Sequence, residues 1–194
     1  MQNETILRPA RISDAPKIAT LIMQAMSDEV CRQYFYGDKH TADDLHQLLT
    51  ALAEREDTQY SYANTVCAVD NTDNVIGACV SYDGSMLRQL RQPFIDGAKD
   101  AIGKDFSNMP EETEAGELYL DSIAVVPEYQ GRGIAKMLLE ATIKKAEDLG
   151  IGPVGLLVDC NNTNAERLYI KVGFRQIGVS NWGGHLMKHL RMPQ

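Results

Sequence analysis

The chain has 194 residues and a formal net charge of −8, with 44% hydrophobic and 24% charged residues. A chain of this length and composition is expected to fold as one soluble domain with a sizeable core. The negative charge argues against a general nucleic-acid-binding protein, because such a protein needs a basic face to meet phosphates, but it is compatible with a cationic substrate.

The N-terminal segment predicts a strand, a helix and an aromatic stretch. Thr5–Pro9 is a short strand candidate, and Ser13 or Asp14 can cap the following helix, which has Pro16 early in its course. Apolar residues at helical spacing form the stripe of that helix: Ile18, Leu21, Ile22 and Ala25. The aromatic stretch, Cys31–Asp38, is interpreted as part of the core or of a lid.

A second helix and a hairpin come next. Thr41, with Asp44 three residues later, has the spacing of a capping box. Leucines at helical spacing predict the buried face of this helix: Leu45, Leu48, Leu49 and Leu52. Residues 63–69 and 75–82 are predicted to form an antiparallel hairpin, because the residues between them are strong turn formers.

Residues 83–116 separate this hairpin from the next strand. Apolar residues at helical spacing predict helix within the segment: Leu87, Leu90, Phe94, Ala98, Ala101 and Ile102. Pro93 is expected to start or break a helix there. The segment ends in an acidic loop with Glu111, Glu112 and Glu114. It is either a solvated connection or a lid or wall of a substrate site, since long loops in compact domains are often functional.

The centre of the chain has the pattern of a strand, a glycine turn and a helix. Glu117–Val126 is apolar enough for a buried strand, Pro127 ends it, and Gly131 and Gly133 precede a run of helical periodicity. The first turn of a helix has unpaired N–H groups and partial positive charge, and glycines let an anion approach the backbone. The turn therefore predicts a phosphate or pyrophosphate site, although plain strand–helix turns contain similar glycines.

The C-terminal quarter continues the alternation of strands and helices. The expected elements are a helix stop at 150–153, a strand at 154–158, a polar turn at 159–164, a helix at 165–172, and strands at 174–179 and 184–190. Thr163 or Asn162 is expected to cap the last helix, and Gly173 to end it.

Two motifs resemble those of a known family. Gln130-Gly131-Arg132-Gly133-Ile134-Ala135 fits the signature Gln/Arg-x-x-Gly-x-Gly/Ala, and residues 164–174 resemble Asn-x-x-Ala/Arg-x-x-Leu-Tyr-x-Lys-x-Gly-Phe. Both are typical of the GNAT superfamily of acyl-CoA N-acyltransferases, and the close resemblance covers about residues 115–180. It implies a mixed α/β (α+β) fold, with a central, mostly antiparallel, splayed sheet flanked by helices. We expect a single domain over residues 1–194, with a helical insert at about 83–116.

The resemblance also implies acetyl-CoA as the co-substrate and no metal. In the family the central strand splays from its neighbour, so main-chain groups near Ile123, Ala124 and Val125 hold the pantetheine and the acyl carbonyl. The glycine turn holds the pyrophosphate through Gln130, Gly131, Arg132, Gly133, Ile134, Ala135 and Lys136. Asn164 matches a residue that contacts the cofactor arm, and Tyr169 matches the tyrosine that donates a proton to the departing thiolate. A phenol with a pKa of about 10 suits a thiol with a pKa of about 8.5.

Two carboxylates are candidates for the catalytic base. Strand alternation predicts one shared face for five residues: Glu117, Tyr119, Asp121, Ile123 and Val125. Glu117 occupies the position of a base in some related enzymes, whereas Asp121 lies closer to the carbonyl site. Either carboxylate can take the proton of an ammonium group directly or through water. Glu117 ranks slightly ahead, and both stay open.

The expected activity is transfer of an acetyl group from acetyl-CoA to a primary amine. Direct attack is favoured because Cys160 has no evident histidine partner for a covalent relay. The acidic loop favours a small, cationic acceptor. Two alternatives stay open: a protein N-terminal or lysine acetyltransferase, and a non-catalytic acyl-CoA-binding sensor.

Cysteine usage and hydropathy indicate the compartment. The cysteines form no Cys-x-x-Cys pair and no zinc pattern, so they are interpreted as buried small residues in a reducing cytosol: Cys31, Cys67, Cys79 and Cys160. The N-terminus lacks the pattern of a signal peptide, and no run reaches membrane-spanning length. We therefore expect a cytoplasmic protein with neither nucleic-acid nor membrane partners, and a homodimer stays open.

Overall fold

The computed structural model describes residues 5–26 and 28–193; residues 1–4, on which the signal-peptide prediction rests, lie outside this range. One seven-stranded sheet has the order β1-β2-β3-β4-β5-β7-β6. Neighbouring strands are antiparallel, except that β4 and β5 are parallel. The strands are β1 (Ile6–Pro9), β2 (Thr65–Val69), β3 (Val75–Asp83), β4 (Leu118–Val125), β5 (Val154–Asp159), β6 (Arg175–Trp182) and β7 (His185–Arg191). The predicted mixed, mostly antiparallel sheet is confirmed.

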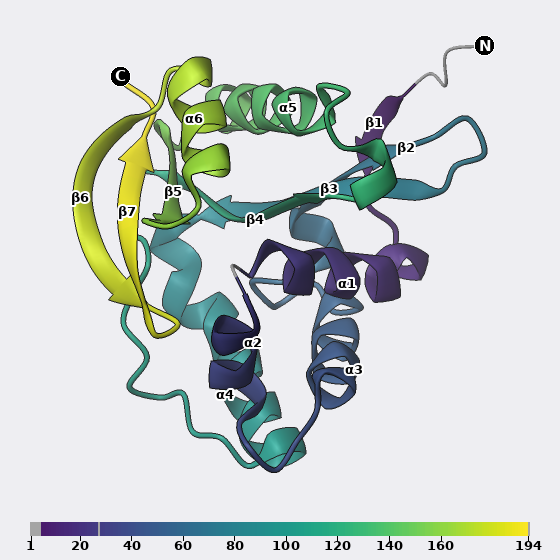
Figure 1. The fold of residues 1–194 in the computed structure, drawn as a ribbon, viewed down its shortest axis with the longest axis vertical. Helices are drawn as coiled ribbons and strands as arrows, with labels where there is room; N and C mark the ends of the chain where they lie inside the picture. Colours follow the sequence, from purple (N-terminus) through teal and green to yellow (C-terminus); the bar gives the residue numbers. More distant parts are fainter. Residues whose placement is uncertain (1–4, 27, 194) are drawn as a thin grey trace.

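Helices cover both faces of the sheet. Figure 1 shows α5 and α6 on one face, and α1, α2, α3 and α4 on the other. The α-helices are α1 (Ala15–Ala25), α2 (Glu29–Tyr36), α3 (Ala42–Ala53), α4 (Leu87–Ile102), α5 (Ile134–Leu149) and α6 (Thr163–Val172). Short 3₁₀ turns are η1 (Ile12–Asp14), η2 (Tyr62–Asn64), η3 (Gly84–Met86) and η4 (Pro127–Tyr129).

The two faces have different cores. Under α1–α4 the core is aromatic: the ring of Phe94 stacks on Phe106 at a centroid distance of 5.1 Å, and Phe35 meets Phe94 edge-on at 6.1 Å. Under α5 and α6 it is aliphatic, with Leu138 and Leu139 fully buried against the sheet. Because both faces are covered, eight of the nine residues of β3 are buried, which explains why its sequence shows no solvated face.

Local signals predict the N-cap residues of α1 and α3 correctly, but only the cap of α3 makes a side-chain hydrogen bond to its helix. Thr41 and Asp44 form the expected capping box, since the Thr41 N–H donates to Oδ2 of Asp44 at 2.8 Å and the Asp44 N–H to Oγ1 of Thr41 at 3.4 Å. Asp14 precedes α1, but its carboxylate makes no cap bond to that helix. It instead pairs with Arg8 at 2.7 Å and accepts the Arg11 N–H at 2.7 Å. The ion pair with Arg8 thus takes the place of a cap bond to α1, because a charged partner forms the stronger hydrogen bond.

The segment after β3 contains one uninterrupted helix. Pro93 lies inside α4 and neither starts nor breaks it, so that prediction is wrong. The residue costs the helix about 3 kcal/mol. Burial of Phe94, Ala98 and Ile102 along one side of α4 offsets this cost. The helix ends at Gly103, whose φ of 65° is left-handed.

Candidate active site

The site begins where β4 and β5 separate. The two strands pair only over Leu118–Leu120 and Val154–Leu156. Beyond that point, residues 121–125 and 157–159 line opposite sides of a cavity of about 730 Å³. Its other lining residues come from α1, β4, the glycine turn, the start of α5, α6 with the residue before it, and β7: Gln24, Ala25, Leu120, Gln130, Gly131, Ala135, Asn162, Asn164, Ala165, Leu168, Tyr169 and Met187. The splayed sheet expected from the family resemblance is therefore present.

The open part of β4 directs main-chain groups into this gap. The Val126 N–H donates to the Ile76 carbonyl on the β3 side at 2.9 Å. Peptide groups alternate along a strand, so those of Val125 point the other way, toward β5. The Val125 carbonyl is not free, however. It accepts the side-chain amides of Gln24 at 2.7 Å and Gln130 at 2.9 Å. Gln24 belongs to α1, far away in sequence, and no local pattern predicted it.

A β-bulge at Asp121 changes which side chains share a face. Opposite β3, Val80 pairs with Ser122 and Ser81 with Leu120, so Asp121 is the extra residue. Tyr119 packs with Leu87 on the α4 side, whereas Ile123 and Val125 join the core under α5. The predicted single face from Glu117 to Val125 is therefore wrong. The sequence alternates correctly on each side of the bulge, but the inserted residue reverses its phase.

Asp121 lies at the cavity wall in a half-buried, hydrogen-bonded position. Its Oδ2 accepts the side-chain amide of Gln59 at 3.3 Å and lies 3.5 Å from the Tyr82 hydroxyl, and its Oδ1 accepts the Ser122 hydroxyl at 2.8 Å. Burial raises the pKa of the Asp121 carboxyl to about 6, against the hydrogen bond from Ser122 and the positive charge of Arg91. A carboxylate with this pKa is ionised at neutral pH and can accept a proton.

Glu117 lies deeper and is not among the residues that line this cavity. Its carboxylate is enclosed, with 1% of the side chain exposed. Oε1 accepts the Thr113 hydroxyl at 2.6 Å, and Oε2 lies 3.1 Å from Nε2 of His189. A Cβ placed on Gly155 of β5 would come within 2.1 Å of this carboxylate, so the glycine makes room for it. Of the two candidate carboxylates, Asp121 therefore lines the cavity and Glu117 does not.

The glycine turn has the geometry needed for an anion. Gly131 and Gly133 have φ values of 73° and 82°, which other residues rarely adopt. Gly133 is the N-cap of α5, so the free N–H groups of the first turn face outward there. A second cavity of about 250 Å³ lies over this turn and includes Val125, Tyr129, Gln130, Gly131, Gly133, Ile134, Ala135, Lys136 and Leu168.

Arg132 differs from its neighbours in the turn. It is not among the residues that line either cavity. Its guanidinium group donates to the Glu128 carbonyl at 2.8 Å and stacks over the Tyr129 ring at 5.0 Å. Of the seven turn residues predicted to meet the cofactor, Arg132 is therefore the one that lines neither cavity.

Helix α6 brings Asn164 and Tyr169 to the same cavity. Both residues line it, and Tyr169 is 7% exposed. Burial raises the pKa of the Tyr169 hydroxyl, so it stays protonated and can donate. Asn162 caps the helix by accepting the Ala165 N–H at 3.1 Å, which decides between the two predicted caps. Asn164 is thus left to face the cavity.

The acidic loop does not supply free carboxylates to the cavity. Glu112 is buried and forms an ion pair with Arg91 of α4. Arg91 also donates to the carbonyls of Met109 and Pro110 at 3.2 and 3.0 Å, so it fastens the loop to α4. The Tyr82 hydroxyl lies 3.3 Å from Glu112 and 3.5 Å from Asp121, which connects this ion pair to the cavity wall.

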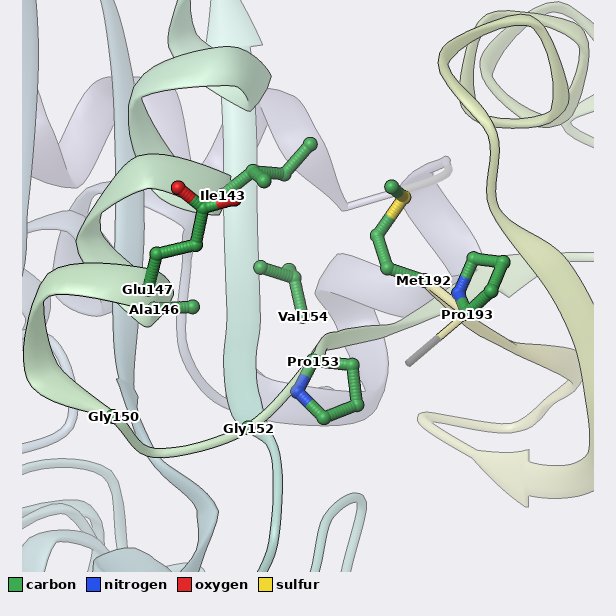
Figure 2. A pocket seen from close by; sticks show the side chains of 9 residues that line it. All are labelled: Ile143, Ala146, Glu147, Gly150, Gly152, Pro153, Val154, Met192 and Pro193. Carbon is green, nitrogen blue, oxygen red and sulfur yellow. The ribbon is translucent and has the colours of Figure 1, made fainter.

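A separate hollow lies at the far end of α5 and has a different character. Figure 2 shows Ile143, Ala146 and Glu147 of α5 on one side and Met192 and Pro193 on the other. Its volume is about 430 Å³. None of the sequence-predicted catalytic or cofactor residues lines it, so it is not a candidate for the reaction centre.

The part of the chain that the structure describes contains no candidate for a metal site or for a membrane span. No group of three or more His, Cys, Asp or Glu side chains is placed to hold a metal ion among residues 5–26 and 28–193. In the same ranges, no helix combines the length and the apolar character needed to cross a bilayer.

Burial raises the pKa values of the Cys67 and Cys79 thiols to about 12 and about 11. Both thiols therefore stay protonated and are inert.

Known proteins share parts of this sequence. The mycothiol acetyltransferase of Pseudarthrobacter chlorophenolicus is 46% identical over 59 residues, which are 30% of this chain and 18% of that protein. The [ribosomal protein bS18]-alanine N-acetyltransferase of Haemophilus ducreyi is 41% identical over 68 residues, 35% of this chain and 47% of that protein. The chain thus spans less than half the length of these curated relatives.

Solved structures share the whole fold. An N-acetyltransferase from Staphylococcus aureus Mu50 superposes with a TM-score of 0.77 at 23% identity, over 96% of this chain and 100% of that one. A further acetyltransferase structure has a TM-score of 0.73 at 24% identity, over 96% and 98% of the two chains. The sequence profile described as "Acetyltransferase (GNAT) family" matches residues 23–174. With this match across most of its length, the chain belongs to the GNAT acetyltransferase family.

Proposed function

We propose that this protein is an N-acetyltransferase that moves an acetyl group from acetyl-CoA to the primary amine of a small molecule by direct attack. One observation carries the proposal: a half-buried carboxylate, Asp121, and a buried phenol, Tyr169, line the same cavity, beside the part of β4 that does not pair with β5. Acyl transfer to an amine needs a base for the amine and an acid for the leaving thiolate, and this pair can supply both.

Acetyl-CoA is the cofactor that the family uses. The cavity beside β4 and the cavity over the glycine turn are proposed to hold its two ends. The turn from Gln130 to Lys136 is proposed to hold the pyrophosphate at the N-terminus of α5. Main-chain groups from Ile123 to Val125, together with Asn164, are proposed to hold the pantetheine arm. The Val125 carbonyl must first give up one of its two glutamine amides, because both of its lone pairs are occupied.

Asp121 is proposed to take the proton of the incoming ammonium group, directly or through one water. An alkyl ammonium has a pKa of about 10.4 in water, so at neutral pH the amine arrives protonated and cannot attack. The free amine then adds to the thioester carbonyl, the C–N bond forms, and the C–S bond breaks. The released thiolate takes its proton from Tyr169, and the phenolate that remains takes the second proton that the amine nitrogen loses as it becomes an amide. The products are the acetamide, the CoA thiol, and one proton that leaves through Asp121.

The acceptor is proposed to be a small cation because of Asp121 rather than because of the acidic loop. Glu112 of that loop is paired with Arg91 and Glu111 with Arg88, so neither is free to meet a substrate. The positive charge of the amine itself faces the Asp121 carboxylate. Residues 1–194 are proposed to act as a single domain, with the 83–116 insert as a wall behind Tyr82 and Asp121.

A protein N-terminal amine is the second candidate acceptor. The similarity to the Haemophilus ducreyi enzyme, whose name includes bS18 alanine, favours it. A peptide needs an open groove, whereas the space beyond Asp121 is small and walled by side chains from several elements. This second reading therefore ranks below a small amine.

Two measurements test the proposal. Calorimetric titration should detect acetyl-CoA binding, and an assay of released thiol across a panel of primary amines should detect amine-dependent turnover. Binding with turnover supports the enzyme. Binding without thiol release for any small amine or N-terminal peptide would support a non-catalytic acyl-CoA sensor, and loss of binding would remove the whole assignment.

A further inference from the structure

The insert at residues 83–116 is connected to Asp121 through two neighbours of one oxygen atom. Oδ2 of Asp121 accepts the side-chain amide of Gln59 at 3.3 Å and lies 3.5 Å from the Tyr82 hydroxyl. The main-chain N–H of Gln59 donates to the Leu90 carbonyl of α4 at 2.9 Å. The Tyr82 hydroxyl lies 3.3 Å from Oε1 of Glu112, in the loop after α4. Both neighbours of this oxygen are therefore held by the insert.

The insert acts from behind the site and does not form its surface. None of the residues 83–116, all of which the structure describes, lines the larger cavity or the smaller cavity beside Asp121. Contact between the insert and an amine in either cavity is thus not part of the arrangement. What the insert reaches is the carboxylate, through Gln59 and Tyr82.

The Tyr82 hydroxyl has one proton and two carboxylates within reach. The residue is 2% exposed, and burial raises the pKa of its hydroxyl, which therefore stays protonated. A phenol has a single O–H to donate, so it bonds either to Asp121 or to Glu112. Glu112 already has a charged partner, because it forms a buried ion pair with Arg91. The Tyr82 proton is therefore available to Asp121 while that carboxylate is ionised.

The ion pair also acts on Asp121 through its charges. Burial raises the pKa of the Asp121 carboxyl to about 6, and the positive charge of Arg91 opposes that rise. The side chains of Arg91 and Glu112 are only 6% and 1% exposed, so water and salt screen their charges little. Without this opposition, Asp121 would hold a proton at neutral pH and could not accept another.

The other titratable groups around Asp121 are neutral or paired. The smaller cavity, which Trp182 of β6 also lines, has three such side chains: Tyr60, Tyr119 and Cys31. Burial raises the pKa values of the two phenols, so both are protonated. Burial likewise raises the pKa of Cys79, on β3, to about 11. Across the larger cavity, the Asp159 carboxylate is paired with Nδ1 of His185 at 2.6 Å.

We propose that Tyr82, Arg91 and Glu112 are positioning residues that keep Asp121 ionised at neutral pH, so that the insert acts on the base of the reaction. The inference rests on the proposed function, because the state of Asp121 affects the rate only if this carboxylate takes the proton of the amine. It gives the insert a task that neither family motif contains.

Tyr82→Phe tests the hydrogen bond. The variant loses the hydroxyl and keeps the ring that meets Tyr119 edge-on at 5.7 Å. Loss of a donor disfavours the ionised carboxylate, so the pH at which Asp121 titrates should rise by roughly 0.5 to 1 unit. NMR of isotope-labelled aspartate, assigned with Asp121→Asn, measures this pH without substrate. The acidic limb of kcat/KM, from thiol release at saturating acetyl-CoA, should move by the same amount.

Glu112→Gln should move both quantities in the opposite direction. The variant removes a negative charge near Asp121 and leaves the positive charge of Arg91 in place. Asp121 should then titrate at a pH lower by roughly half a unit or more, although the protein becomes less stable because Arg91 loses its partner. Loosened packing alone would not move the titration upward in one variant and downward in the other.

Arg88→Gln is the matched control. Arg88 pairs with Glu111 across the same two segments, α4 and the acidic loop, but its side chain is 86% exposed. The change removes one positive charge from α4, one turn before Arg91, where solvent and salt screen it. Both the titration of Asp121 and the acidic limb should stay where they are in the wild type.

The outcomes separate this inference from the function on which it rests. An unchanged Asp121 titration in Tyr82→Phe would overturn the inference, even if Glu112→Gln does not fold. Shifts of the same sign in both variants would also overturn it. Opposite shifts by NMR, with an acidic limb that does not follow them, would instead remove Asp121 as the base. Absence of thiol release with every amine would contradict the proposed function, while the NMR titration still tests the contacts with Asp121.

Discussion

The two halves of β4 differ in their pairing, and the difference locates the chemistry. Leu118–Leu120 has a strand on each side, β3 and β5, whereas residues 122–125 pair with β3 alone and Asp121 is the bulge residue between the two halves. Glu117 lies at the closed end and its carboxylate is held by Thr113 and His189. Asp121 lies where the strands part and lines the cavity. Two nearby acids thus have different surroundings, because the pairing of β4 with β5 stops between them.

The largest effect is expected from Asp121→Asn. Removing the base should lower kcat/KM by roughly 10² to 10⁴. A base must be ionised, so the wild-type rate should fall as the pH drops through about 6, the raised pKa of Asp121. The measurement is kcat/KM against pH for both proteins, and the acidic limb should vanish in the variant. If that limb instead disappears in Glu117→Gln, the assignment of the two halves is reversed.

The next effect is expected from Tyr169→Phe. This change removes the proton donor for the thiolate and keeps the ring that packs on Phe174 at 5.8 Å. The kcat should fall roughly 10², with little change in KM for acetyl-CoA. An acetyl thioester of a more acidic thiol should recover part of the loss, because its thiolate leaves without a proton. No recovery, together with a raised KM, would show that the phenol binds the cofactor and does not donate.

A smaller effect is expected from Gly131→Ala in the glycine turn. Alanine has free space there but must adopt a φ of 73°, which costs about 1 kcal/mol. The KM for acetyl-CoA should rise roughly three- to tenfold, because the turn would relax away from the pyrophosphate. Gly150→Ala is the matched control, since Gly150 has a φ of 64° and equally open space at the other end of α5. It should lower the melting temperature similarly and leave KM unchanged.

The smallest effect on rate is expected from Glu117→Gln, at the closed end of β4. The amide oxygen of the variant can still accept the Thr113 hydroxyl, but the carboxylate beside Nε2 of His189 is lost. The free energy of unfolding should therefore fall by about 1 to 2 kcal/mol. Turnover should change less than twofold. Urea unfolding and thiol release measure the two quantities on one preparation. A stable protein with strongly reduced turnover would return Glu117 to the reaction.

The sequence predicted most of the framework, because the framework is local. The capping box at Thr41, the strand before Pro127 and the glycines that begin α5 are each encoded within a few neighbouring residues. The two motifs predicted the family, which the spacing of apolar residues alone did not predict.

What the sequence did not predict depends on contacts between distant residues. The bulge at Asp121 arises from the register against β3 and shifts every side chain beyond it by one face. Gln24 and Trp182 reach the site from α1 and from the end of β6, with no motif to mark them. Pro93 remains inside α4 because tertiary burial outweighs its local cost.

The two glutamine amides on the Val125 carbonyl also affect the tendency of the protein to aggregate. A strand that loses its partner midway is a template to which a foreign chain can add, and such edges promote aggregation. Here the exposed acceptor of β4 is covered by Gln24 and Gln130, at 2.7 and 2.9 Å. An invading strand would have to displace both amides to gain one bond. The protein can therefore keep an internal sheet edge open for catalysis without presenting it as a nucleus for fibres.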